Sequence, residues 1–415
     1  MADTKLHTTD IHSVVIDAGV CTTRVGYAGD EAPRYVAPSA YGVRLSENSP
    51  TPSSYINSEL TLSTRLPHTE IRSPFDHTGL IADWEGLEQN WKYIFNYLGI
   101  IPEESPLIIA EPSHNSISHR ERLCQLLFDS FNVPAVYFAK TSVLAAFANG
   151  KTSGLVVDIG SCGTSVTPIL DGSVVQKCIA RSPLGGTMFS QLLDSFVSHR
   201  LNLKPFYRIS KKITSSGQYQ VSDLGLDGIS PSFENFHRHL LLQEIKSCCF
   251  LVNETFIDQP SKSTNPLHTY VLPDGQLLEM GPCSVNIPEL FFSNTIKDYL
   301  YQQVNPQCDL NSVAPIQDII RHCLSSCDPD TRKSVSNNII LTGGSSMMRG
   351  FTRRFGLEVE HLGLKNTSFL EDFDRPYTSW IGGSILGSMH TFHQLWISKQ
   401  EFQEHGTTIV ERKCR

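Results

Sequence analysis

One apolar motif occurs twice in this chain, once near its start and once in its middle part. Residues 14–19 read VVIDAG, and residues 155–160 read LVVDIG. Each segment has the pattern of a buried strand that ends at an Asp, any residue and a Gly, and each is followed by a second apolar segment typical of the returning strand of a hairpin. An internal repeat of this kind predicts a fold with two related halves.

The two predicted turns have the chemistry of a phosphate-binding site. Gly19 and Gly160 lack a side chain, so backbone N–H groups at these turns can approach an anion closely. Asp17 and Asp158 stand at the strand ends, where a carboxylate can hold the water shell of Mg²⁺. Two such turns that face each other would hold the phosphates of a nucleotide from both sides, whereas one turn alone is better explained as the closure of a hairpin.

A third glycine-rich element lies in the C-terminal part of the chain. Residues 339–342 predict a buried strand that leads into Gly343 and Gly344, and a helix is expected from Phe351. A turn before a helix can place backbone amides near a phosphate or an adenosine. The three elements together indicate a nucleotide cleft far more specifically than any one of them does.

Length and composition fit a globular protein with two lobes. The chain has 415 residues, which is more than one compact core usually holds, and 40% of its residues are hydrophobic. The net charge is -8, and basic residues never run longer than pairs such as Lys211-Lys212. Tight binding to nucleic acid needs a clustered basic face, so we expect contact with DNA to come through partners unless the fold assembles such a face.

The cysteine pattern bears on metal binding and on the cellular compartment. The chain holds 11 cysteines, and none has the paired CxxC spacing of a zinc site. The nearest approach, His322-Cys323 followed by Cys327, is interpreted as buried thiols in a helix. The odd count and the absence of a secretory leader in residues 1–10 fit a reducing compartment, and no apolar run has the length of a membrane span. Cytosol or nucleus is therefore expected.

Several segments spread over nearly the whole chain resemble actin. Residues 27–34 (YAGDEAPR) resemble the segment after actin's first phosphate loop, and residues 272–276, 380–386, 396–401 and 412–414 are close to verbatim. On these segments the chain is identified as a member of the actin family. The same segments disfavour a sugar kinase or an Hsp70-type ATPase, which share the cleft.

The resemblance implies an α/β fold, the actin-like ATPase fold, with two duplicated ribonuclease-H-like lobes around a nucleotide cleft. The first lobe would comprise residues 1–150 and 378–415, with a small outer subdomain at about 43–72. The second lobe would comprise residues 151–377, including an insertion relative to actin at about 202–239.

The resemblance also assigns roles at the cleft, with ATP and Mg²⁺ as the implied cofactors. Phosphate and Mg²⁺ would be served by Asp17, Gly19, Asp158 and Gly160, the two aspartates through water, with Arg24 at the place of actin's phosphate-contacting Lys. The adenosine would be bordered by Lys246, Gly343, Gly344 and Met347. The alternatives are plain turn geometry for the glycines and an ordinary surface charge for Lys246.

The cleft also departs from actin. Changes at the phosphate loops and the adenosine side weaken the expected grip on a nucleotide: Val20 and Cys21 replace Ser and Gly, Ser161 and Cys162 replace Asp and Gly, and Ser247 and Pro376 replace Glu and Lys. Thr141 and Ser165 stand where actin has the Gln and His that orient the attacking water. We therefore expect a degenerate site that binds ATP without efficient hydrolysis, and we assign no catalytic residue.

Residues 138–150 and 181–186 resemble the nuclear actin-related proteins of chromatin complexes. That branch implies a monomeric architectural subunit that pairs with actin or another actin-related protein on a helix of a remodelling ATPase of the SWI/SNF or RSC type, and reaches chromatin mainly through the complex. A histone acetyltransferase complex is an alternative. The rival from another class is a divergent cytoskeletal ATPase, which Thr141, Ser165 and the outer loop disfavour.

A groove for partner helices follows from the same resemblance. Its lining would be small or apolar, as recognition of an amphipathic helix requires: Phe147, Ala148, Gly150, Thr152, Ile385, Leu386, Met389 and Thr391. The alternative is that Ile385, Leu386 and Met389 are ordinary core residues.

Filament formation is not expected. The segment 43–71 shows little resemblance to the actin subdomain that engages the next subunit, and the polar run from Ser46 to Ser54 predicts a mobile loop.

Overall fold

A computed structural model gives the structure of the chain and describes residues 13–46, 49–56, 68–213, 219–257, 259–261, 269–304, 306, 308–364, 367–368 and 374–414. Residues 1–10, on which the leader prediction rests, lie outside these ranges. In the described part no helix is long and apolar enough to cross a membrane.

The first lobe is built on a six-stranded sheet. Its strand order is β19-β8-β7-β1-β2-β3. The bounds are β1 (Val14–Ala18), β2 (Thr22–Tyr27), β3 (Tyr35–Pro38), β7 (Leu107–Glu111), β8 (Ala135–Lys140) and β19 (Ile397–Ser398). The helices α2 (Trp84–Leu98), α3 (Ile117–Asp129), α13 (Lys399–His405) and α14 (Ile409–Lys413) belong to this lobe, and a buried apolar core includes side chains of β1, α2, α3 and α14.

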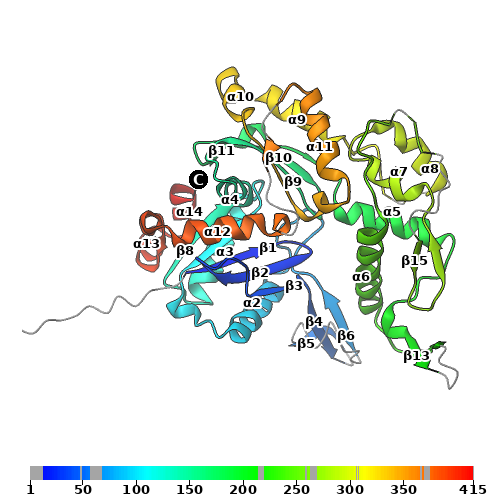
Figure 1. Ribbon diagram of the computed structural model, residues 1–415. Coiled ribbons are helices and arrows are strands. Elements are labelled where there is room, and N and C mark those ends of the chain that lie inside the picture. The colour runs from blue at the N-terminus through cyan, green and yellow to red at the C-terminus, as the bar shows by residue number, and fades with distance from the viewer. Residues whose placement is uncertain are drawn as a thin grey trace, which may run out of the picture.

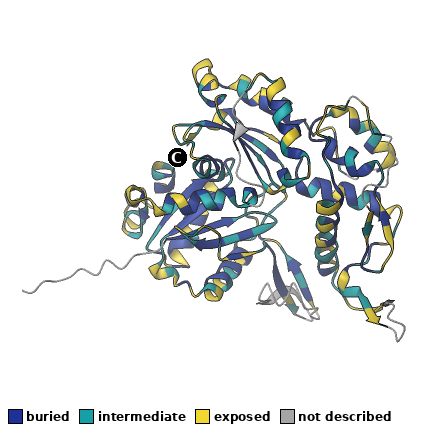
Figure 2. Cartoon of the chain, viewed as in Figure 1, coloured by how far each residue is buried: buried dark blue, intermediate teal, exposed yellow. Residues whose placement is uncertain are grey.

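The second lobe is built on another six-stranded sheet, ordered β11-β10-β9-β17-β18, with β12 also paired to β10. The strands are β9 (Gly154–Ile159), β10 (Thr164–Leu170), β11 (Ser173–Val174), β12 (Ala180–Ser182), β17 (Ile339–Thr342) and β18 (Thr367–Ser368). The helices are α5 (Gly186–Ser198), α6 (Pro231–Cys249), α7 (Cys283–Glu289), α8 (Lys297–Gln303), α9 (Ile316–Ser326), α10 (Pro329–Val335) and α11 (Phe351–His361). Figure 2 shows that the strands of both sheets are coloured mainly as buried.

The two sheets repeat one connection pattern. In the first lobe β1 pairs with β2 antiparallel and with β7 parallel. In the second lobe β9 pairs with β10 antiparallel and with β17 parallel. The repeated motif read in the sequence is therefore a structural duplication, and the predicted α/β class and actin-like fold are confirmed.

Two helices lie between the sheets (Figure 1): α4 (Thr141–Ala148) and α12 (Thr378–Ser388). They touch backbone to backbone, because a Cβ atom on Gly382 would lie 1.9 Å from the carbonyl oxygen of Leu144. Glycine at this position is what allows so close a crossing. The C-terminal segment thus returns to the first lobe through α12 and β19.

An outer three-stranded sheet, β5-β4-β6, projects from the first lobe. Its strands are β4 (Tyr41–Ser46), β5 (Ser49–Ile56) and β6 (Thr69–Arg72). The prediction of a mobile loop from Ser46 to Ser54 is wrong for Ser46, which ends β4, and for Ser49 to Ser54, which lie in β5. Residues 47–48 lie outside the described part. The polar, proline-containing composition misled the prediction, since prolines are tolerated on an edge strand such as β5.

The segment predicted to be an insertion relative to actin carries a projecting hairpin of the second lobe. It contains β13 (Ile209–Ile213), β14 (Tyr219–Asp223) and the start of α6 (Figure 1). A second short hairpin is formed by β15 (Thr269–Val271) and β16 (Leu277–Glu279).

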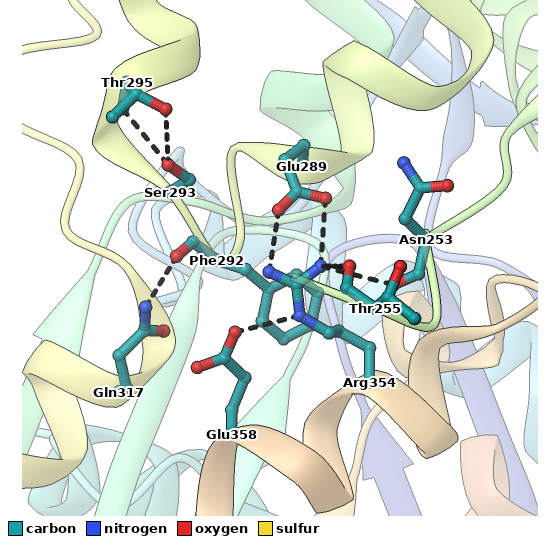
Figure 3. A network of polar contacts seen from close by, with 9 residues as sticks. All are labelled: Asn253, Thr255, Glu289, Phe292, Ser293, Thr295, Gln317, Arg354 and Glu358. Atoms are coloured by element: carbon teal, nitrogen blue, oxygen red, sulfur yellow. Dashed lines mark hydrogen bonds and ion pairs between the residues drawn. The ribbon is translucent and has the colours of Figure 1, made fainter. Parts of the chain in front are cut away.

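One buried arginine joins several segments of the second lobe (Figure 3). Arg354 of α11 forms ion pairs at 2.8 Å with Glu289 and at 2.9 Å with Glu358, and it donates to the carbonyl oxygens of Asn253 and Thr255. Burial raises the pKa of Glu289 to about 7, although Arg354 acts in the opposite direction. Because the charges are out of water, this network depends on every member being paired.

A similar network fixes the C-terminal end of the first lobe. Arg120 pairs at 2.8 Å with Glu111, which also pairs at 2.9 Å with Lys140. Arg120 further contacts Glu411 and the carbonyl oxygen of Cys414. The last described residues are thereby part of the interior of the lobe.

Candidate nucleotide cleft

A cavity of about 550 Å³ lies where the ends of the strands of the two lobes meet. The predicted cofactor-binding residues all line it: Asp17, Gly19, Arg24, Asp158, Gly160, Lys246, Gly343, Gly344 and Met347. The structure therefore brings together, in one cleft, residues that the sequence separates by more than three hundred positions.

The two phosphate-loop turns have matching geometry. The amide of Gly19 donates to the carbonyl oxygen of Thr22, and the amide of Gly160 donates to that of Gly163, both at 3.0 Å. The carboxylates precede these turns at corresponding places, Asp17 in β1 and Asp158 in β9. The two copies of the repeat therefore correspond down to an individual backbone hydrogen bond.

Arg24 stands opposite Asp17 in the strand register, and the two side chains form an ion pair at 2.9 Å. The guanidinium also donates to Thr22 Oγ1 at 2.8 Å and lies 5.4 Å from the ring centre of Tyr377. Its Nε atom is buried and has no hydrogen-bond partner among the described residues. The guanidinium of Arg24 is thus held by hydrogen bonds on one side and keeps an unused donor, Nε, on the other. Such a group is suited to an anionic ligand.

Asp158 is the most perturbed carboxylate of the cleft. Burial first, and then the negative charge of Asp17, raise the pKa of Asp158 to about 6, while Arg24 lowers it. Two carboxylates that repel each other at the strand ends are the donor set that a hard divalent cation prefers. Asp17 and Asp158 therefore fit Mg²⁺, which would relieve the repulsion. The described ranges hold no group of three or more His, Cys, Asp or Glu side chains that could bind a metal ion. Mg²⁺ commonly uses one or two carboxylates and takes its other ligands from water and substrate phosphates.

Gly343 brings the third predicted element against the second turn. Its φ angle is 95°, and a Cβ atom there would lie 2.4 Å from the carbonyl oxygen of Ile159 and 2.5 Å from Asp158 Oδ1. Only glycine fits at this position. Ser345, one residue beyond Gly344, donates to the carbonyl oxygen of Gly160 at 3.0 Å, and α11 begins at Phe351 as expected.

Lys246 of α6 is bonded within the cleft wall. Its ammonium donates to the carbonyl oxygen of Gly186 at 2.9 Å and to Ser190 Oγ at 3.1 Å, which ties α6 to the start of α5. Burial lowers the pKa of Lys246 to about 8. These contacts distinguish it from an ordinary surface charge.

The replaced loop residues touch each other across the cleft. Cys21 Sγ of the first lobe lies 3.0 Å from Ser161 Oγ of the second, and Gln243 Nε2 donates to Cys21 Sγ at 3.5 Å. Burial, with a smaller contribution from Cys21, raises the pKa of Cys162 to about 11. Thr141 and Ser165, at the positions of actin's water-orienting pair, also line the cavity.

Sequence reasoning missed several residues of the cleft. Arg181 lines it and donates to the carbonyl oxygen of Thr78 at 3.4 Å, so it bridges the lobes. His114 lines it too, and burial lowers the pKa of His114 to about 4, followed by the charge of Arg181. Arg181 opens the segment 181–186, whose resemblance to nuclear actin-related proteins indicated the branch of the family but not the cleft, and His114 lies in none of the predicted turns.

The predicted partner groove lies beside α4 and α12. Ile385 and Met389 are exposed by 41% and 43%, whereas Leu386 is exposed by only 8% and belongs to the apolar core between the helices. The remaining predicted residues are exposed or half-buried: Phe147, Ala148, Gly150, Thr152 and Thr391. Ile385 and Met389 are therefore the most exposed large apolar side chains of the set.

The duplicated sheets and the cleft between them define a protein of the actin fold class. The chain belongs to the actin family, whose sequence model, described as Actin, matches residues 8–415.

Curated relatives match over almost their full length. Actin-related protein 4 of Arabidopsis thaliana is 32% identical, and that of Oryza sativa subsp. indica is 33% identical; in each case 98% of this chain and 99% of the relative are covered. The SWI/SNF and RSC complexes subunit arp42 of Schizosaccharomyces pombe is 31% identical, over 98% of this chain and 100% of the relative.

Proposed function

We propose that this protein is a non-polymerising architectural subunit of nuclear chromatin remodelling complexes of the SWI/SNF or RSC type. It docks on a helix of the remodelling ATPase, beside actin or a second actin-related protein, and takes part in chromatin remodelling and transcription regulation. The observation that carries this proposal is the full-length similarity to a relative named as a subunit of SWI/SNF and RSC complexes.

The surface beside α4 and α12 supports the docking part of the proposal. Ile385 of α12 and Met389 directly after it expose apolar side chains, and Phe147 of α4 is half-buried. The close crossing of α4 and α12 leaves these helices little freedom to rearrange. An amphipathic helix presents apolar side chains at intervals of three and four residues, which suits a narrow apolar strip between two helices.

The cleft supports a ligand role for the nucleotide. Arg24, Asp17 and Asp158 suit the phosphates and Mg²⁺ of ATP, so the protein binds the nucleotide. Thr141 and Ser165 are too short to take over the water-positioning role of Gln and His, so turnover is inefficient. ATP then stabilises the closed lobes by mass action, because it binds the folded state alone.

The docking proposal is tested by affinity purification of the tagged chain from nuclei, with identification of co-eluting proteins. The variant carrying Ile385→Asp and Met389→Asp should lose the remodelling ATPase, while its melting temperature stays unchanged. Leu277→Asp, at a side chain that is 60% exposed far from the groove, is the matched control and should retain the ATPase. Unchanged recovery in the groove variant would show that the groove is not the docking site.

The same purification separates the alternatives. Recovery of an acetyltransferase scaffold in place of a remodelling ATPase would assign the chain to a histone acetyltransferase complex. Cytoskeletal partners with brisk ATP turnover would assign it to the divergent cytoskeletal ATPases.

A further inference from the structure

The N-terminal end of α6 contacts the outer sheet of the first lobe, although α6 belongs to the second lobe. The hydroxyl of Ser230 donates to the carbonyl oxygen of Thr69 at 2.8 Å, and the amide of Ile71 donates to the hydroxyl of Ser232 at 3.0 Å. Both lobes therefore meet at a second place besides the nucleotide cleft.

These two hydrogen bonds complete the edge of a sheet. β6 is an edge strand, paired with β4 on one side. The amide of Ile71 and the carbonyl of Thr69 lie two residues apart, so they point in the same direction along the strand. A helix that supplies one hydroxyl to each group covers an edge that would otherwise be left for water or for another strand.

An apolar cluster lies beneath the hydrogen bonds. Ile71 and Ala40 of the first lobe are buried together with Phe233 of α6, at 8%, 6% and 4% exposure. The insertion contributes half-buried Tyr207, whose ring lies 5.0 Å from that of Phe233 in an edge-to-face arrangement. Separating the lobes here would return this apolar surface to water, which is unfavourable in proportion to its area.

Two side chains that precede β13 stabilise the start of α6 at this contact. Arg208 donates twice to Glu234, at 2.7 and 2.9 Å, and Tyr207 donates to the same carboxylate. Bonds to one carboxylate from two neighbouring residues hold the start of β13 against the first turn of α6. Tyr207 and Arg208 are thus held against the first turn of α6 at the contact.

The other end of α6 reaches the nucleotide cleft. α6 has 19 residues, so it spans about 28 Å. Ser230 caps its first turn, and Lys246 near its last turn holds the cleft wall at Gly186. Arg238, between them, pairs with Asp194 and joins α6 to α5. α6 therefore connects the contact with the outer sheet to the wall of the cleft.

We propose that the insertion and the start of α6 form an interlobe clasp, defined by Ser230, Ser232 and Phe233 with Thr69 and Ile71, which holds the cleft closed and slows the release of a bound nucleotide. This inference rests on the proposed nucleotide binding. It assigns a role to the insertion, which the resemblance to actin left without one.

The clasp is tested with Ser232→Ala in the full-length protein. Ser222→Ala, on exposed β14 of the same insertion, is the matched control. The protein is loaded with Mg²⁺ and radiolabelled ATP, and dissociation is followed after addition of excess unlabelled ATP. Loss of one hydrogen bond of about 1 kcal/mol should speed release about fivefold, while Ser222→Ala should release at the original rate. Phe233→Ala should have a larger effect in the same direction.

Hydrogen exchange gives a reading that needs no nucleotide. Ser232→Ala should raise exchange not only at Ile71, which loses its acceptor, but also at the cleft turns 19–22 and 160–163. Faster exchange at Ile71 alone, or unchanged ATP release from a protein that binds ATP, would overturn the clasp. If the protein binds no ATP, the nucleotide part of the proposed function fails, and the exchange at the two turns still decides whether the clasp controls closure.

Discussion

Cys21 and Ser161 lie 3.0 Å apart, sulfur to oxygen, although they belong to the phosphate loops of opposite lobes. Each side chain stands at a position where an actin-like loop was expected to present a different residue to phosphate. The contact means that these loops have a direct interaction of their own, in addition to any that a nucleotide would provide.

Replacing both loop cysteines by glycine should strengthen nucleotide binding. Cys21→Gly with Cys162→Gly removes two side chains that line the cavity and lets backbone amides approach a phosphate. We expect the affinity for Mg-ATP to rise about tenfold, measured by titration calorimetry. Cys248→Gly, at an exposed cysteine outside the lining of the cavity, is the control and should leave the affinity unchanged. Weaker binding in the double variant would show that the thiols aid the ligand.

Restoring the water-orienting side chains should raise ATP turnover. Thr141→Gln with Ser165→His returns groups that can position a water, and positioning of this kind accounts for much of phosphoryl-transfer catalysis. We expect at least a tenfold rise in phosphate release from the pure protein under single-turnover conditions. Efficient turnover by the unsubstituted protein would contradict the assignment of a degenerate site.

The raised pKa of Asp158 predicts a pH-dependent stability. The pKa of Asp158, about 6, lies above the ordinary value of about 4 for an aspartate. Between these two pH values the folded state keeps a proton on Asp158 that the unfolded state has lost. The stability contributed by that proton is complete below about pH 4 and is lost as the pH rises through 6. Asp158→Asn should therefore raise the free energy of unfolding at pH 7.5 by about 2 kcal/mol, with little effect at pH 4.

The same substitution should weaken the binding of Mg-ATP. Without the carboxylate, Mg-ATP should raise the melting temperature of Asp158→Asn less than that of the original protein at pH 7.5. Equal shifts in the two proteins would remove Asp158 from the cation site.

The buried arginine of Figure 3 should be essential for stability. Arg354→Met leaves the carboxylates of Glu289 and Glu358 buried beside a neutral side chain, which costs about 3–5 kcal/mol in comparable cases. Its chain neighbour Arg353 pairs with Glu254 at a surface where both side chains are about half or more exposed. Arg353→Met should change the unfolding free energy by less than about 0.5 kcal/mol in urea denaturation.

Sedimentation should detect no filaments. The edge of β6 is covered by α6, and the segment 43–71 differs from the subdomain that actin uses to engage the next subunit. The protein at micromolar concentration in salt that polymerises actin should stay in the supernatant, with actin as the positive control. A pellet that grows with protein concentration would contradict this expectation.

Local sequence patterns predict the strands and turns that belong to the internal repeat. The sequence places Asp17 and Asp158 at the ends of buried strands, and Gly343 at a turn, because apolar runs and glycines are visible within short windows. The resemblance to actin then brought Arg24 and Lys246 into the same site.

Contacts between distant segments could not be predicted in this way. Arg181 and His114 enter the cleft because their strands and loops pack there, although neither belongs to one of the glycine turns predicted for the site. The covered edge of β6 depends on Ser230 and Ser232, about 160 residues away, and no sequence pattern links these serines to β6. β5 was mistaken for a loop because the partner strand, not its own composition, makes it a strand.

The return of the C-terminal segment to the first lobe has a consequence for how the protein is made. β8 pairs with β7 but lacks its outer neighbour β19 until residues 397–398 are available. Arg120 likewise keeps unpaired hydrogen-bond donors until Glu411 and Cys414 have been synthesised. The strands of the second lobe lie between residues 154 and 368, so that lobe can fold on the ribosome while the first remains incomplete. The lobe that is synthesised first is thus the last to be finished, and during translation its open sheet edge is a natural client for a chaperone.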